Sequence, residues 1–444
     1  MSEFKPLLKL AVPLMASSVA FMGLDIVDTI MMGELGTAQL AAGTLSWLVF
    51  ILLLMFCIGL SNAVALHIAG AVGAKKNEDI SSFFQDGIYL LAITAPALML
   101  AMFFLPDFFH LIHQPQAVVE QSRPFINGIL PGMPATLGFL LLRDYSSSMH
   151  YPRIIMIITL LSLPLDAALN YILMYGKFGL PALHLMGIGL STSILEWLMF
   201  SAMLIYVYCK KPLRGAIFTR LQKPNWGEIY ETFKLGWPIG VAGIFEMGLF
   251  TVTAIMMGYL GVTVLAAHEI VIQWTSLGYM FVFGLAQACG IRIAYHIGAK
   301  RPQHINLVFK LGLIIGLVIA SIFALLFFSI PHTLTDVFLN IHVPHQSAVL
   351  IFTQQFFLIA IVFQFFDVLQ VVATSSLRGM KDTLVPMFLG LGSYWLVGLI
   401  SGGLMAFVFG MGGRGLWYGL VLGIAASGLI LYWRFQRLLH FTAI

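Results

Sequence analysis

The composition of the 444-residue chain excludes a water-soluble globular protein. Hydrophobic residues make up 60% of it, whereas Asp, Glu, Lys and Arg make up 9%, against about 25% in ordinary soluble domains. The 42 glycines and a mean hydropathy of +0.95 favour a polytopic helical membrane protein, in which small residues let helices pack closely. The formal net charge of +4 is small and gives no indication of nucleic-acid binding.

Twelve segments are apolar over the roughly 20 residues that a membrane-spanning helix needs. In chain order they lie near residues 7–32, 40–66, 87–106, 124–146, 154–175, 185–208, 232–258, 264–291, 308–330, 348–376, 386–409 and 414–433. Counting Lys and Arg in alternate connections places 20 on one side of the membrane and 3 on the other. The positive-inside rule therefore predicts that both termini and the long 209–231 connection are cytoplasmic.

An internal repeat relates the two halves of the chain at an offset of 225 residues. The aligned pairs include Pro13 with Pro238, Gly59 with Gly284, and residues 31–33 with residues 256–258. We therefore predict an all-α integral membrane protein with two six-helix lobes, 1–208 and 232–444, joined by the cytoplasmic loop 209–231. Because six is even, the lobes enter the membrane in the same direction and their pseudo-twofold axis runs along the membrane normal. Transporters of this architecture hold substrate between the halves and alternate access by rocking.

Seven of the nineteen acidic residues fall inside the predicted spans by four residues or more, whereas no basic residue lies near a span centre. These acids are Asp25, Asp28, Asp166, Glu196, Glu246, Glu269 and Asp367. An intramembrane carboxylate costs about 2.5 to 3.5 kcal/mol on insertion scales, so each must be protonated, hydrated or matched by an external cation. The excess of acids favours a cation path, with Glu246 and Asp367 near mid-membrane. The alternative is that some of these acids are protonated structural groups or lie closer to an interface.

A second polar cluster is predicted in the first half of the chain. Asp166 and Asn170 are four residues apart and share one face of a helix, and Asp28 and Thr192 are the polar residues expected to join them. A carboxylate among amides and hydroxyls can keep or release its proton as its neighbours move. A coupling site requires this property.

Pro13 and Pro238 lie early in the first predicted helix of each half. A proline inside a helix removes one backbone hydrogen bond and permits a kink, so the pair predicts two hinges. The alternative is that each is a proline close to the interface at the start of its span.

Several motifs are absent from the sequence. It contains no Gly-x-x-x-x-Gly-Lys-Ser/Thr to cradle the phosphates of ATP and no nucleophile elbow. The three cysteines, Cys57, Cys209 and Cys289, have no paired metal-ligand spacing. We therefore predict no catalytic residues, no ATP, no cofactor and no metal site other than one for Na⁺.

Five stretches carry a resemblance to a known family. They are residues 27–31, 175–179, 266–268, 366–372 and 376–379, which read Val-Asp-Thr-Ile-Met, Tyr-Gly-Lys-Phe-Gly, Ala-Ala-His, Phe-Asp-Val-Leu-Gln-Val-Val and Ser-Leu-Arg-Gly. Over essentially its whole length the chain resembles the multidrug and toxic compound extrusion (MATE) transporters, specifically the NorM-type branch. The resemblance implies a multi-pass protein of the bacterial inner membrane that expels amphipathic organic cations, such as drugs and dyes, in exchange for Na⁺ or H⁺.

The resemblance also implies roles for individual carboxylates. In NorM-type members the carboxylates that match Glu246 and Asp367 are associated with cation binding, so Na⁺ is a candidate ligand there. The carboxylate that matches Asp28 is associated with coupling and substrate response.

The chain departs from the family pattern at some of these positions. Asp166 precedes Asn170, where an Asn followed by Asn or Asp is usual, and Thr192 matches a hydroxyl associated with that cluster. Phe363 stands where some relatives have Tyr, and Glu269 stands where Gln is common. These departures leave the coupling ion open.

We therefore predict a monomeric secondary antiporter whose partners are small organic cations and membrane lipid, with Glu246, Asp367 and Asp28 as cation-binding or coupling residues. The substrate pathway or a supporting polar cluster is assigned to Asp166, Asn170, Thr192, Asp25, Glu269, Gln273 and Phe363. The main alternative is a lipid-linked oligosaccharide flippase of a related superfamily, although a bound pyrophosphate would need basic residues where these spans are acidic. An ion channel and an integral-membrane enzyme are further alternatives.

Overall fold

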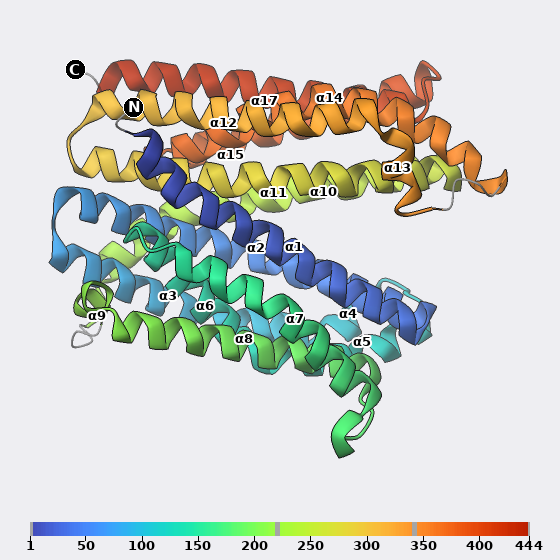
Figure 1. Ribbon diagram of the computed structural model, residues 1–444, viewed down its shortest axis with the longest axis horizontal. Coiled ribbons are helices and arrows are strands. Elements are labelled where there is room, and N and C mark those ends of the chain that lie inside the picture. Colours follow the sequence, from blue (N-terminus) through green and yellow to red (C-terminus); the bar gives the residue numbers. More distant parts are fainter. Residues whose placement is uncertain (1–2, 218–222, 340–343, 443–444) are drawn as a thin grey trace. The chain divides into compact units, whose positions relative to one another are not determined.

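The computed structural model of the protein describes residues 3–217, 223–339 and 344–442 (Figure 1). Twelve helices in these ranges are long and apolar enough to cross a membrane, which confirms the predicted all-α integral membrane fold. The chain divides into two compact units. The N-terminal unit is Ala16–Gly240, and the C-terminal unit consists of the residues up to Met15 together with those from Val241 onward.

Every regular element of the N-terminal unit is a helix, in the part of the chain that is described. Its helices are α1 (Phe4–Leu35, from Ala16), α2 (Thr37–Ala74), α3 (Asn77–Phe103), α4 (Leu105–Leu111), α5 (Gln116–Ile129), α6 (Met133–Ser148), α7 (Arg153–Tyr175), α8 (His184–Cys209) and α9 (Lys211–Ile217), followed by the start of α10. The fourth span, expected as one helix, is interrupted by the 3₁₀ turn η1 (Leu130–Gly132). Pro131 and Pro134 are the second residues of η1 and α6, where a missing N–H breaks the α-helical ladder.

The C-terminal unit contains the remaining helices. They are α10 (Trp226–Tyr259, from Val241), α11 (Val262–Gly298), α12 (Pro302–Ser329), α13 (Pro331–Asp336), α14 (Pro344–Gly379), α15 (Leu384–Leu391), α16 (Ile400–Gly403) and α17 (Gly413–Thr442). In the eleventh span the π-helical segment η3 (Gly392–Leu399) links α15 to α16, and a second π-helical segment, η4 (Leu404–Val408), follows α16. Glycines let this span pack directly on α17, since a Cβ at Gly419 would lie 2.3 Å from the Cα of Gly402.

The predicted connecting loop 209–231 is only partly visible. Residues 210–217 and 223–231 are described, and they include α9 and the start of α10, whereas residues 218–222 lie outside the described ranges. The expected lobe boundaries, 1–208 and 232–444, therefore stay a prediction.

The 225-residue repeat is visible in the backbone. Gly36 and Gly261 precede the second helix of each half with φ of 126° and 118°, a conformation that strongly favours glycine. Lys75 and Lys300 follow the close of that helix with φ of 57° and 54°. The two halves therefore begin and end this helix with the same local geometry.

The repeat extends to tertiary contacts made by the first helix of each half. In the N-terminal unit, a Cβ at Gly59 of α2 would lie 2.3 Å from the backbone N of Gly240 in α10. In the C-terminal unit, a Cβ at Gly284 of α11 would lie 2.5 Å from the backbone N of Met15 in α1. Both contacting pairs are related by the same offset. The backbone of the first helix of each half thus packs against a glycine in the second helix of the other half.

Candidate functional site

Three helices of the N-terminal unit bring the first-half polar cluster together. Asn170 of α7 donates through Nδ2 to Oδ1 of Asp28 in α1 at 2.7 Å and to Oδ2 of Asp166, one turn away, at 3.3 Å. Ser191 of α8 donates its hydroxyl to Oδ1 of Asn170. Asn170 and Ser191 are completely buried. Asn170 therefore uses both ends of its amide to organise the carboxyl groups.

The carboxyl groups of Asp28 and Asp166 also interact directly with each other. Carboxylates are acceptors only, so two carboxyl groups can share a hydrogen bond only when one of them carries a proton. The second oxygen of Asp166, Oδ1, is buried without a hydrogen-bond partner among the described residues. The arrangement can thus hold one exchangeable proton between two acids, and it keeps one further acceptor free.

The predicted hydroxyl partner, Thr192, does not point at this cluster. Its hydroxyl donates to the carbonyl of Ile188 in its own helix at 3.0 Å, whereas the neighbouring Ser191 joins the cluster. Successive residues on a helix point about 100° apart, so only one of the two can face Asn170. Sequence reasoning missed Ser191; its signal was a second hydroxyl beside Thr192.

Asp25 and Glu196 lie around the same cluster. Asp25 is one turn from Asp28 on α1, and the charges of the two residues interact, although the Asp25 side chain is exposed in the isolated protein. Glu196 of α8 interacts electrostatically with Asp166, and its Oε2 atom is buried without a hydrogen-bond partner in the described part of the chain. Acids thus surround the cluster on two helices.

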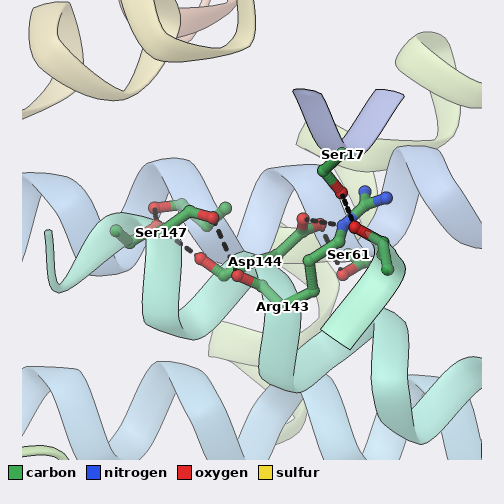
Figure 2. A network of polar contacts seen from close by, with 8 residues as sticks. Ser17, Ser61, Arg143, Asp144 and Ser147 are labelled. Carbon is green, nitrogen blue, oxygen red and sulfur yellow. Dashed lines mark hydrogen bonds and ion pairs between the residues drawn. The ribbon is translucent and has the colours of Figure 1, made fainter. Parts of the chain in front are cut away.

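A partly buried ion pair lies on α6 of the same unit (Figure 2). The Nε of Arg143 donates to Oδ1 of Asp144 at 3.1 Å, and Ser61 of α2 donates to Oδ2 of the same carboxylate at 2.7 Å (Figure 2). Arg143 also interacts electrostatically with Glu196. Sequence reasoning did not select this pair. Asp144 thus has two hydrogen-bond partners, and Arg143 is the basic residue that interacts with Glu196.

The C-terminal unit brings Glu246 of α10 and Asp367 of α14 into electrostatic contact. Tyr279 of α11 and Tyr394 of η3 interact electrostatically with both carboxylates. Arg378, near the end of α14, is a third charged group that interacts with Glu246. The sequence assigned Arg378 to a cytoplasmic connection, but α14 continues to Gly379. The sequence did indicate that Arg378 shares a helix face with Asp367, because the two are eleven residues apart, about three helical turns.

Two glutamines flank Asp367 on the same face of α14. Gln370 donates through Nε2 to the hydroxyl of Tyr394 at 2.5 Å, and its Oε1 is buried without a hydrogen-bond partner in the described residues. The amide of Gln364 is likewise buried without one, and Gly278 of α11 provides the room for it. Amide and carboxylate oxygens are the ligands that hard cations such as Na⁺ prefer.

The other predicted residues of this unit have apolar or exposed surroundings. Phe363 is 2% exposed and packs against Phe250 and Trp417, with ring centroids 6.2 and 6.1 Å away. It therefore forms an apolar wall one turn before Asp367. Glu269 and Gln273 are exposed and lie one turn apart on α11.

Pro13 and Pro238 are buried inside α1 and α10. Pro13 lies two residues before Met15, and Pro238 lies two residues before Gly240. After Met15 and after Gly240 the helix passes from one unit to the other. The prolines thus stand where a helix that belongs to both units would bend.

Comparisons with known proteins show which family the chain resembles. The MatE family model matches residues 13–172 and 238–403. The chain is 34% identical over 447 residues to a probable multidrug resistance protein NorM from Pseudomonas putida, covering 99% of this chain and 96% of that protein. It is 33% identical over 444 residues to one from Rhizobium meliloti, covering 99% and 94%.

Solved structures share the fold. The crystal structure of the eukaryotic MATE transporter AtDTX14 matches with a TM-score of 0.85 at 19% identity, covering 99% of this chain and 98% of that one. An outward-facing multidrug resistance MATE family transporter of the MOP superfamily matches with a TM-score of 0.89 at 16% identity, covering 99% and 96%.

Proposed function

The chain belongs to the MatE family, NorM type, and on that premise we propose that it exports amphipathic organic cations in exchange for H⁺ or Na⁺. Family membership makes it a multidrug efflux transporter of small molecules and a multi-pass protein of the inner membrane. Members of the family are transport proteins rather than enzymes, and they need no cofactor.

The main support for cation exchange is the excess of buried acid in both units. The N-terminal unit pairs Asp28 with Asp166 around Asn170, and the C-terminal unit pairs Glu246 with Asp367. Where buried carboxylates outnumber the bases near them, they are stabilised by a proton, a metal cation or an organic cation. The direct approach of the Asp28 and Asp166 carboxyl groups, both bonded to Asn170, supports a proton as the ion at the first site. The unpartnered amide oxygens beside Asp367 fit either Na⁺ or H⁺ at the second.

Exchange follows from competition for these acids. An ion that enters from outside occupies the carboxylates and favours release of the organic cation, and a new organic cation from the cytoplasm later displaces the ion. One charge that moves down 100 mV supplies about 2.3 kcal/mol, enough for nearly 50-fold accumulation. We place both termini in the cytoplasm, as the basic-residue count predicts. The protein works as a monomer in lipid, without ATP and without nucleic acid.

The test is ethidium efflux from vesicles that contain the purified protein, with Na⁺ and H⁺ gradients imposed separately. We expect one gradient to drive uphill efflux, and we expect Glu246→Gln or Asp367→Asn to abolish it while expression stays normal. The matched control is Asp107→Asn, because Asp107 is an exposed acid of α4 outside the predicted spans, and this variant should behave like the wild type.

Two outcomes would overturn this proposal. Full coupled efflux by both Glu246→Gln and Asp367→Asn would remove these carboxylates from the ion pathway. No efflux under either gradient, with folded protein, would remove organic-cation antiport and make the lipid-linked oligosaccharide flippase the first alternative.

A further inference from the structure

A compact cluster of titratable side chains lies in the C-terminal unit, separate from the pair Glu246 and Asp367. It joins Glu3, directly before α1, to His296 near the end of α11 and His304 near the start of α12. The start of α1, the connection between α11 and α12 and the end of α17 lie at the same end of this unit (Figure 1). The basic-residue count predicts that this end is cytoplasmic.

The distances in the cluster are those of a nearly formed coordination sphere. Oε2 of Glu3 lies 3.1 Å from Nε2 of His296, and Oε1 of Glu3 lies 3.3 Å from Nδ1 of His304. One ligand atom from each of the three residues lies within 4.8 Å of the others. A tetrahedral zinc ion with bonds of about 2.0 to 2.1 Å separates its ligands by roughly 3.3 Å. Small side-chain shifts would therefore suffice to bind a metal ion.

The chemistry of the three side chains selects a class of ion. Two imidazole nitrogens and one carboxylate oxygen form a ligand set typical of Zn²⁺, whereas Mg²⁺ and Ca²⁺ prefer oxygen ligands alone. Burial raises the pKa of Glu3, but hydrogen bonds and charge from Arg292 and His296 lower it more, so the carboxylate has a pKa below its usual range. Nδ1 of His304 is buried close to Glu3 but makes no hydrogen bond within the described residues.

Arg292 occupies the position where a metal ion would compete. Its Nη2 lies 2.5 Å from Oε2 of Glu3 and 3.2 Å from Nε2 of His296. The guanidinium also stacks on the ring of Tyr295, with 4.9 Å between its Cζ and the ring centroid. Tyr295 therefore offers the cation a second partner if a metal ion displaces it from Glu3.

We propose that Glu3, His296 and His304 form a binding site for a divalent transition-metal ion, represented by Zn²⁺, for which Arg292 is the built-in competitor. An ion bound there would fix the start of α1 to both α11 and α12. The His304 side chain is 24% exposed and provides access from solvent. Sequence spacing gave no indication of this site because its ligands come from three elements up to 301 residues apart.

The test is calorimetric titration of ZnCl₂ into the full-length protein in detergent, after treatment with EDTA. The affinity tag must be a streptavidin-binding peptide at the C-terminus, because a polyhistidine tag binds zinc and an N-terminal tag would crowd Glu3. We expect one Zn²⁺ per chain and a rise in melting temperature on binding. His304→Ala, His296→Ala and Glu3→Gln should each weaken binding about tenfold or more.

Arg292→Gln separates a metal site from a purely structural ion-pair cluster. Removing the competitor should tighten Zn²⁺ binding, whereas a zinc ion bound elsewhere would not respond. His184→Ala, at an exposed histidine of α8, is the matched control and should leave the affinity unchanged. Unchanged stoichiometry and affinity in the double variant His296→Ala, His304→Ala would overturn the proposal, as would weaker binding by Arg292→Gln. If the buried His296→Ala variant does not fold, the partly exposed His304→Ala variant decides alone.

Discussion

Asn170 holds the first polar cluster together because its amide donates to two acids and accepts from Ser191. Ser191→Ala would leave Oδ1 of Asn170 buried without this donor, which costs about 1 to 3 kcal/mol. The amide would then lose its fixed orientation toward Asp28 and Asp166. We expect gradient-driven ethidium efflux to fall at least about fivefold, the kinetic equivalent of about 1 kcal/mol. Initial rates in vesicles with matched protein content measure this effect.

Thr192→Val is the control for that prediction. The Thr192 hydroxyl is bonded to the carbonyl of Ile188 in its own helix, so an isosteric apolar side chain removes no contact with the cluster. Efflux by this variant should stay close to the wild-type rate. The reverse order of effects, with Thr192→Val impaired and Ser191→Ala normal, would contradict the geometry of α8.

The difference between Ser191 and Thr192 illustrates what the sequence could predict at this scale. The spacing of Asp166 and Asn170 places them on one helix face, and the structure brings both to Asp28. The rotation of α8 about its own axis, which selects Ser191, depends on how all its neighbours pack. Arg378 was missed for a related reason, because hydropathy ends a predicted span where charge begins, whereas α14 continues past that point to Gly379.

At the scale of single elements, the close packing of helices at glycine is the feature most sensitive to mutation. In the N-terminal unit a Cβ at Gly59 would lie 2.3 Å from the backbone of Gly240, and in the C-terminal unit a Cβ at Gly284 would lie 2.5 Å from Met15. Backbone atoms cannot rotate away as a side chain does, so the helices must separate. Gly59→Ala and Gly284→Ala should each lower the stability by about 1 to 3 kcal/mol or more. Thermal unfolding in detergent measures the loss.

Gly33→Ala is the matched control, since a Cβ at Gly33 in α1 meets nothing within 4 Å. This variant should keep the wild-type melting temperature or exceed it slightly, because alanine favours a helix by roughly 1 kcal/mol over glycine. A wild-type melting temperature for Gly59→Ala would mean that α2 and α10 are less closely packed than the structure has them.

The elements themselves were largely predictable from hydropathy, but their interruptions were not. All twelve expected spans overlap long apolar helices. The turn η1 inside the fourth span and the π-helical segments of the eleventh were missed. Average hydropathy is insensitive to a proline such as Pro131, and it carries no information on the glycine packing between Gly402 and Gly419.

At the scale of the whole molecule, the repeat predicted two halves, but it did not predict where the compact units divide. The boundaries fall after Met15 and after Gly240, and these two residues are themselves related by the 225-residue offset. Hydropathy measures whether a segment can face lipid, and it does not tell which bundle each part of a helix packs against. Membership of both units is a property of α1 and α10 that only their tertiary contacts reveal.

Because α1 and α10 each belong to both units, their prolines lead to a prediction about the whole molecule. If the two units move against each other during transport, α1 and α10 must bend where they change unit, two residues after Pro13 and Pro238. Replacing either proline by alanine restores a backbone N–H, so the helix should become stiffer and the melting temperature should not fall. We expect ethidium efflux by Pro13→Ala and by Pro238→Ala to drop about fivefold or more, corresponding to about 1 kcal/mol in the rate-limiting step. Pro96→Ala is the control, because Pro96 lies inside α3, a helix of one unit only, and this variant should transport normally. Wild-type efflux by both hinge variants would leave these residues as prolines at the start of their spans, with no mechanical role.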